Sequence, residues 1–132
     1  MMAVDTSALI AIVLGEPDAR DCIQVLGQEP DIIISAATLT EALIVAARRG
    51  QAAALDRLMA ALNLRVIPHT EASARRASQA YEAWGKGLHP AGLNLGDCFA
   101  YEVAQHHNCP LLYLGDDFAK TDIESALPTA GD

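Results

Sequence analysis

Short apolar segments alternate with longer segments of helical periodicity along this chain. Four segments are short, apolar and rich in branched residues, a pattern typical of buried strands; they span 2–4, 31–35, 64–68 and 110–114. Between them the spacing of apolar residues predicts helices, which span 7–14, 18–28, 35–49, 51–62, 70–84 and 94–107. We also expect a short edge strand around Ile123 and a tail from about Leu127.

This alternation indicates an α/β fold. Strands that alternate with helices form a parallel sheet with helices on both faces. The pattern therefore predicts a central parallel sheet of four to five strands flanked by helices. The 132 residues are too few for two full domains, so a single domain over 1–132 is expected.

The composition indicates a folded protein. Hydrophobic residues make up 52% of the chain and charged residues 20%, the opposite of the pattern of disorder. The longest apolar runs, 8–14 and 42–47, fall far short of the ~20 residues that cross a bilayer. The first residues lack the basic start of a signal peptide, and the three cysteines form no C-x-x-C pair. We therefore expect no membrane segment, buried thiols and a cytoplasmic location.

The charge balance limits the classes of binding partner. Nine basic residues against seventeen acidic ones give a net charge of -8, which disfavours tight binding of nucleic acid through its phosphates. A transient nucleic-acid substrate is still compatible with this charge. Because carboxylates can gather around a cation, the placement of the acids matters more than their total.

Several acids occupy unusual places for solvated charges. Asp5 ends an apolar strand, Glu41 is the only charge between 38 and 47, and Asp97 follows Asn94 by three residues. Asp116 and Asp117 follow the last strand. Each has an ordinary alternative: Asp5 as a helix cap, Glu41 as a solvent-facing residue, Asp97 as a capping-box acid, and the Asp pair as turn formers.

Taken together, these acids point to a metal site. In parallel sheets the ligand lies beyond the carboxyl ends of the strands, where these acids are expected to meet. Several carboxylates at one place repel one another unless a cation neutralises them. An all-oxygen site suits Mg2+ or Mn2+, which also accept phosphate oxygens. The chemistry that follows is metal-assisted hydrolysis of a phosphodiester.

Other chemistries lack their sequence motifs. No P-loop, dinucleotide fingerprint, G-x-S-x-G or H-E-x-x-H motif occurs in the chain. An aspartate-based phosphotransfer domain also has an acid at a strand end, but here no second acid follows Asp5 two residues later. The four histidines indicate no metal site, although His89, in the loop over 85–92, is a candidate RNA contact.

Four motifs, in this order and spacing, resemble the PIN-domain ribonucleases, specifically the VapC-like toxins of toxin–antitoxin pairs. The resemblance covers essentially the whole chain. The motifs are Val4-Asp5-Thr6-Ser7-Ala8-Leu9, the lone Glu41 after Ile33-Ile34-Ser35, Leu93-Asn94-Leu95-Gly96-Asp97-Cys98-Phe99-Ala100-Tyr101, and Leu112-Tyr113-Leu114-Gly115-Asp116-Asp117-Phe118 with Thr121-Asp122-Ile123.

The resemblance implies a PIN-like three-layer sandwich and a Mg2+- or Mn2+-dependent endoribonuclease. The acidic quartet falls on Asp5, Glu41, Asp97 and the Asp116-Asp117 pair, within which Asp117, next to Phe118, is favoured. Asp5 and Asp97 are then the principal metal ligands. Thr6, Ser7 and Asn94 are candidates for orienting the carboxylates or bound water.

The resemblance also implies partners. VapC-like toxins form homodimers and are silenced by a small antitoxin, here a VapB-like protein. The apolar helices between Ala8 and Leu62 exceed what one face of a small sheet needs, which is compatible with partner surfaces; alternatively they fill the core. The competing class is a catalytically silent, PIN-like interaction module, and a phosphotransfer domain is a third hypothesis.

Overall fold

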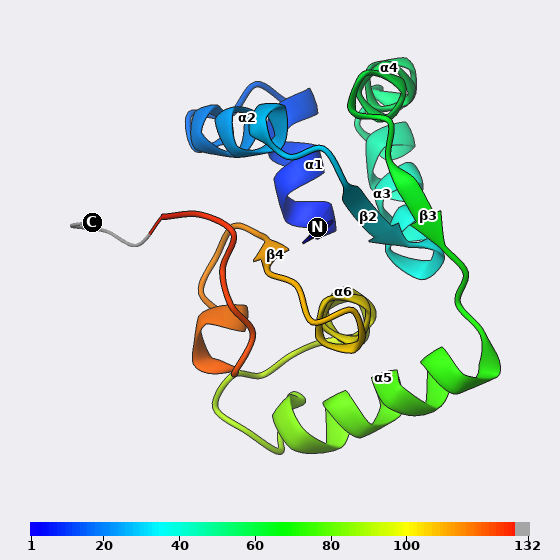
Figure 1. Ribbon diagram of the computed structural model, residues 1–132, viewed down its shortest axis with the longest axis vertical. Helices are drawn as coiled ribbons and strands as arrows, with labels where there is room; N and C mark the ends of the chain where they lie inside the picture. The colour runs from blue at the N-terminus through cyan, green and yellow to red at the C-terminus, as the bar shows by residue number, and fades with distance from the viewer. Residues whose placement is uncertain (129–132) are drawn as a thin grey trace.

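The computed structural model describes residues 1–128 of the chain and forms an α/β sandwich (Figure 1). Its strands are β1 (Met2–Val4), β2 (Ile32–Ser35), β3 (Arg65–Ile67) and β4 (Leu111–Leu112). Its helices are α1 (Thr6–Val13), α2 (Ala19–Gln28), α3 (Ala36–Arg48), α4 (Ala52–Leu62), α5 (Glu71–Trp84) and α6 (Leu95–His106), and a 3-10 turn, η1, spans Phe118–Lys120.

The four strands form one parallel sheet in the order β3-β2-β1-β4. Ala3 in β1 pairs with Ile33 on one side and with Leu111 on the other. Because all strands run the same way, their carboxyl ends lie along one edge of the sheet. The residues that directly follow β1 and β4 are therefore neighbours in space, as the sequence predicts.

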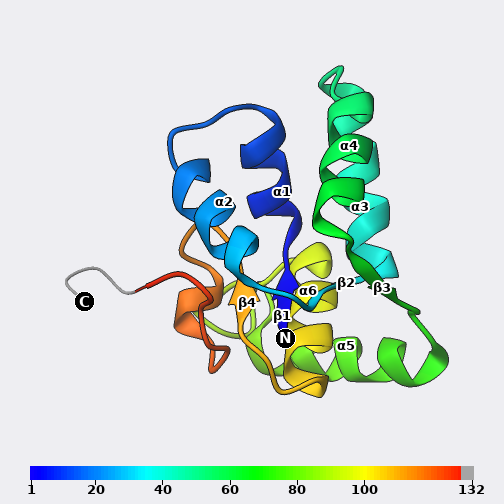
Figure 2. The same cartoon turned by 45° about the horizontal axis from the view of Figure 1, so that its top comes forward.

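Alternation along the strands creates two separate cores. Ala3, Ile33 and Leu111 face α5 and α6, in a core that includes Leu93 and Tyr101. On the opposite face, a second core combines strand residues with residues of α1 to α4: Met2, Val4, Ile32, Ile34, Leu112, Leu9, Leu26 and Leu55. Figures 1 and 2 show α1 to α4 on one side of the sheet and α5 and α6 on the other. The three-layer prediction is confirmed.

Polar residues at the helix starts define the boundaries. The side chains of Ser35, Thr70 and Asn94 each cap the helix that follows, as their positions in the sequence indicate. Asp5 caps α1 by accepting a hydrogen bond from the Ser7 amide. At the C-terminal end of α4, Asn63 adopts a left-handed conformation (φ 52°). Its backbone amide donates to carbonyl groups of the last helical turn, and the chain then enters β3.

The last part of the sheet is smaller than the sequence predicts. β4 contains two residues rather than the segment 110–114, and the expected edge strand around Ile123 is reduced to one parallel bridge between Leu111 and Ser125. Two backbone hydrogen bonds hold this bridge, from Leu111 N to Glu124 O and from Ala126 N to Leu111 O, each 2.9 Å. Side-chain pattern alone does not set the length over which two backbones pair. Leu127 packs against the second core, and the rest of the expected tail, from 129, lies outside the described residues.

Within residues 1–128, none of the helices has the length and apolar character needed to cross a membrane. Cys22, Cys98 and Cys109 are buried free thiols, as expected.

Candidate active site

Asp5 stands at the carboxyl end of β1 and is almost fully buried, with 5% of its surface exposed. Its Oδ2 accepts hydrogen bonds from the Ser7 amide (3.1 Å) and the Ser7 hydroxyl (2.7 Å). Burial raises the pKa of Asp5, Ser7 opposes this shift, and the nearby charge of Glu41 adds to it. Asp5 is thus both the helix cap and the buried carboxylate that the sequence suggested.

Ser7 connects Asp5 to the end of β4. While its hydroxyl donates to Asp5, it accepts a hydrogen bond from the Leu114 amide at 3.0 Å. The Asp5 amide in turn donates to the Leu112 carbonyl at 2.9 Å. Two strand ends that are more than 100 residues apart in sequence are therefore held together at this carboxylate.

Glu41 reaches the same place from α3. Its Oε1 accepts a hydrogen bond of 2.7 Å from the hydroxyl of Thr6, in the first turn of α1. Thr6 is buried and Glu41 is partly buried. The contact confirms that Glu41 is not a free solvent-facing residue.

Asp97 lies in the first turn of α6. Asn94 Oδ1 accepts from the Asp97 amide (2.9 Å) and Asp97 Oδ2 accepts from the Asn94 amide (3.1 Å), which completes a capping box. Burial, opposed by the Asn94 hydrogen bond and reinforced by three other carboxylates, raises the pKa of Asp97 to about 6. Those three carboxylates are Asp5, Asp117 and Glu41.

The acids that act on the Asp97 pKa come from different elements of the fold. Asp5 follows β1, Glu41 lies on α3, Asp97 on α6, and Asp117 on the turn after β4. Asp116 and Asp117 are both exposed, but only Asp117 is among the charges that raise the Asp97 pKa. This electrostatic influence on Asp97 is consistent with Asp117 as the fourth acid, and the choice between Asp117 and Asp116 stays a prediction.

The donor set is chemically suited to Mg2+ or Mn2+, because every candidate ligand is a carboxylate oxygen. Yet within residues 1–128, no three Asp, Glu, His or Cys side chains lie close enough to hold one ion together. Asp5, Glu41 and Asp97 each have one oxygen hydrogen-bonded to a neighbouring residue. The assignment of Asp5, Glu41, Asp97, Asp116 and Asp117 as metal ligands stays a prediction.

Comparison with known proteins places the chain in a family. The PIN domain family model matches residues 2–124. Ribonuclease VapC42 of Mycobacterium tuberculosis is 41% identical over 129 residues, covering 95% of this chain and 98% of that protein. Ribonuclease VapC30 of the same organism is 42% identical over 133 residues, covering 96% and 100%. This chain belongs to the PIN domain family and, within it, to the VapC ribonucleases.

Solved structures show the same PIN fold. VapC20 of Mycobacterium tuberculosis, described as a sarcin-ricin loop cleaving toxin, superposes with a TM-score of 0.79 at 17% identity, covering 97% of this chain and 100% of that one. A toxin-antitoxin complex from Klebsiella pneumoniae gives 0.71 at 23% identity, covering 98% and 97%.

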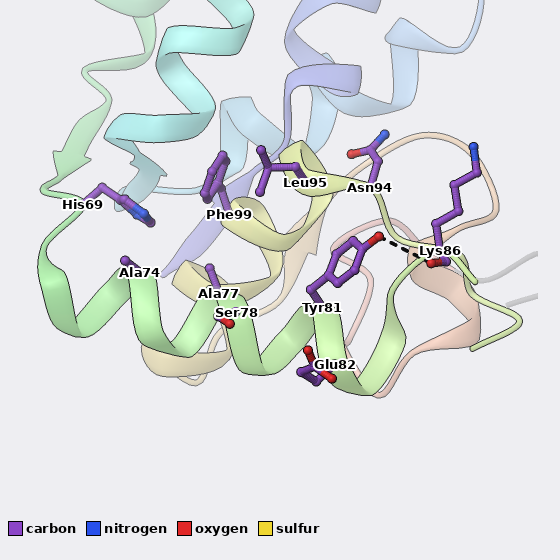
Figure 3. Close-up of a pocket in the computed structure, with 10 residues that line it drawn as sticks. All are labelled: His69, Ala74, Ala77, Ser78, Tyr81, Glu82, Lys86, Asn94, Leu95 and Phe99. Carbon is purple, nitrogen blue, oxygen red and sulfur yellow. Dashed lines mark hydrogen bonds between the residues drawn. The ribbon is translucent and has the colours of Figure 1, made fainter. Parts of the chain in front are cut away.

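An apolar groove lies beside the acids of this PIN domain. It has a volume of about 630 Å3 and runs between α5 and the first turns of α6 (Figure 3). Leu95 lines the groove together with Asn94, which forms the capping box with Asp97, and His69 packs edge-on against Phe99 at a centroid distance of 4.9 Å. Sequence patterns did not predict this groove, because its walls come from segments that meet only in the folded chain.

The histidines of the PIN domain have structural contacts. His89 accepts a hydrogen bond from the Ala91 amide through Nδ1 and packs against Trp84, so it shapes the loop over 85–92. Whether it also contacts RNA stays a prediction.

Two contributions to the site were missed in the sequence. Tyr101 donates to Asp122 Oδ1 (2.6 Å) and accepts from Trp84 Nε1 (3.1 Å), so it ties the segment after Asp117 to α5 and α6. Gly96 stands directly against the Glu41 carboxylate. In the sequence, Gly96 lies within the third motif of the resemblance and inside a predicted helix, where glycine is unfavourable, but neither feature indicated a contact with Glu41.

Proposed function

We propose that this chain is a metal-dependent endoribonuclease toxin of a toxin–antitoxin pair, which hydrolyses RNA phosphodiester bonds at the acidic site. The observation that carries the proposal is the proximity of Asp5, Glu41 and Asp117 to Asp97, whose pKa is raised to about 6 by burial and further by these three charges. A group of partly buried carboxylates is costly unless it serves to bind a cation. The membership of the chain among VapC ribonucleases supports the same activity.

Asp5, Asp97, Glu41 and Asp117 are the residues that we expect to hold Mg2+ or Mn2+. When bound, such an ion activates water and stabilises negative charge on the phosphate. The remaining work belongs to neighbouring side chains. Ser7 orients Asp5, Thr6 orients Glu41 and Asn94 orients Asp97, each through a hydrogen bond of 3.1 Å or less. In the overall reaction water adds across a P–O bond, leaving a phosphate on one RNA fragment and a hydroxyl on the other.

A phosphotransfer role is disfavoured by the surroundings of Asp5. That carboxylate is 5% exposed and its Oδ2 accepts two hydrogen bonds from Ser7, so it is poorly placed to attack a phosphoryl donor. A silent interaction module would have no need of several carboxylates that repel one another.

The decisive experiment is RNA cleavage by purified protein with Mg2+ or Mn2+. We expect wild type to cut RNA and Asp5→Asn to be inactive. Asp56→Asn is the matched control, because Asp56 is an exposed acid on α4 and the substitution changes charge equally. Sequencing of the RNA ends after induced expression would identify the target. Absence of cleavage by the wild type with Mn2+ would favour the silent module.

We also propose an antitoxin partner of the VapB type. The structural similarity to a toxin-antitoxin complex supports it. Ile23 on α2 and Ile44 on α3 are both 54% exposed, and such residues can anchor an apolar segment.

An Arg or Lys of the antitoxin would then neutralise Asp5 and Asp97. Replacing that residue with Ala in the protein encoded by the neighbouring gene should weaken inhibition, and association should slow as salt rises. Full inhibition at a salt-independent rate would leave apolar packing alone as the explanation.

Finally, we propose that the chain forms a homodimer. The groove of Figure 3 is mostly apolar, and Leu95, which lines it, is 65% exposed, so a second copy could place its own Leu95 and α5 against the same surface. We expect Leu95→Arg to shift wild-type dimers to monomers in sedimentation. The matched control is Leu88→Arg, because Leu88 is a similarly exposed leucine (57%) that does not line the groove. Equal dimerisation of both variants would exclude this surface.

A further inference from the structure

The carboxylate of Glu41 rests on a spot of α6 where there is no side chain. Gly96 is the second residue of that helix. A Cβ atom added to Gly96 would lie 2.9 Å from Glu41 Cδ and 3.0 Å from Oε1, and Oε2 would be closer still. Real Cβ contacts are rarely this short, so Glu41 in its present position requires glycine here.

Backbone geometry does not explain the glycine. Within residues 1–128, the glycines with positive φ are Gly15, Gly50, Gly87, Gly92 and Gly115, and Gly96 is not one of them. Glycine is also among the least favourable residues in a helix. Of the atoms that approach the missing side chain, the three nearest all belong to Glu41.

We propose that Gly96 is a positioning residue, whose missing side chain lets the Glu41 carboxylate lie against the first turn of α6 beside Asp97. This rests on the proposed metal-dependent function. Two features then set the position of the Glu41 carboxylate. Thr6 donates a hydrogen bond to its Oε1 at 2.7 Å, and the absence of a side chain at Gly96 leaves room for its Oε2. A methyl group at position 96 would displace the carboxylate from the other acids.

The fold should survive this substitution. The group that a methyl would displace is the end of a flexible side chain rather than backbone, so Glu41 can rotate away. Alanine also favours the helix. Gly96→Ala should therefore move the Glu41 carboxylate without lowering the stability of the protein.

The experiment compares Gly96→Ala with Gly27→Ala. Gly27 lies in α2, and nothing is within 4 Å of a Cβ added there. Both variants should keep the fold. Gly96→Ala should weaken Mn2+ binding, measured by calorimetry, and reduce RNA cleavage, each by about 10- to 100-fold, the range found when supporting contacts of metal ligands are lost. Gly27→Ala should leave both unchanged.

A double-mutant cycle with Glu41→Ala tests the mechanism directly. Without the Glu41 carboxylate, the methyl at position 96 meets no obstacle. Gly96→Ala should then cause no further loss of Mn2+ affinity, and it should raise the unfolding midpoint more than it does when Glu41 is present. Equal effects of Gly96→Ala in both backgrounds would overturn the proposal. If Gly96→Ala and the double variant both fail to fold, the glycine serves α6 itself and the proposal is also wrong.

The outcomes separate this proposal from the proposed function. If the wild type cleaves RNA and Gly96→Ala keeps full Mn2+ affinity and activity, only the role of Gly96 is refuted. If the wild type neither binds Mn2+ nor cleaves RNA, the proposed function fails. In that case the unfolding midpoints of the cycle still show whether Gly96 and Glu41 are coupled.

Discussion

The hydroxyl of Thr6 lies 2.7 Å from Oε1 of Glu41, joining two residues that are 35 positions apart in the chain. Thr6 opens α1 directly after the buried strand β1, whereas Glu41 lies in the middle of α3. The hydrogen bond therefore holds together α1 and α3, the helices that follow the neighbouring strands β1 and β2. It also fixes one carboxylate of the site relative to another, since Asp5 is the residue before Thr6.

Thr6→Val should impair activity without unfolding the protein. Valine keeps the shape of the buried side chain but cannot donate to Glu41. We expect RNA cleavage to fall about 10- to 100-fold, as for other lost supporting hydrogen bonds near metal ligands. Thr6→Ser retains the donor and should stay close to wild type in the same assay. Equal loss in both variants would mean that packing, not the hydrogen bond, is what Thr6 supplies.

Asp116 and Asp117 should differ in their effect on cleavage. Asp117 contributes to the raised pKa of Asp97, whereas Asp116 is not among its main causes. Asp117→Asn should therefore reduce cleavage at least about tenfold more than Asp116→Asn, by comparison with the cost of lost supporting contacts. The neighbouring substitutions change charge identically, so each is the control for the other. A larger loss for Asp116→Asn would reverse the assignment.

Removal of metal should abolish activity but not the fold. The two cores on either face of the sheet contain none of the acids assigned to the metal. With EDTA, cleavage should fall to background while the unfolding midpoint changes by only a few degrees. Added Mn2+ should restore cleavage. Unfolding in EDTA would instead identify a structural metal.

Asp97 should make the metal-free protein more stable at mildly acidic pH. Its pKa is raised from near 3.8 to about 6 by burial and by the surrounding carboxylates. Between these two values the folded protein binds more protons than the unfolded chain, so the Asp97 contribution to the free energy of unfolding grows as pH falls from about 6 to 4. The difference in stability between wild type and Asp97→Asn should change over this range in denaturant titrations. A constant difference would show that the Asp97 carboxyl is not perturbed.

Tyr101→Phe should destabilise the fold. The substitution leaves Trp84 Nε1 without its acceptor and Asp122 without its donor, and Tyr101 is buried. The expected cost is about 1–3 kcal/mol in the free energy of unfolding. Tyr81→Phe is the control, because its hydroxyl makes only an exposed bond of 3.4 Å to the Lys86 carbonyl. Similar stability of the two variants would show that the Tyr101 hydroxyl contributes little.

Local pattern in the sequence was sufficient to predict the six helices and the approximate positions of the four strands. Helix starts at Ser35, Thr70 and Asn94 follow from short polar side chains that cap the next amides, an interaction within three residues. The strand at Ile32–Ser35 follows from a β-branched run. Because parallel strands end at one edge, the placement of Asp5 and Asp117 after two neighbouring strands could be predicted.

Tertiary structure alone decided the finer arrangement of the site. Three contacts join segments that lie far apart in sequence, and no local pattern predicts them. They are the hydrogen bond between Thr6 and Glu41, the close approach of Gly96 to the Glu41 carboxylate, and the hydrogen bond from Tyr101 to Asp122. The length of β4 and the single bridge at Ser125 likewise depend on how closely two backbones approach. Periodicity and capping act within a few residues, whereas the orientation of a carboxylate is set by packing among helices that lie far apart along the chain.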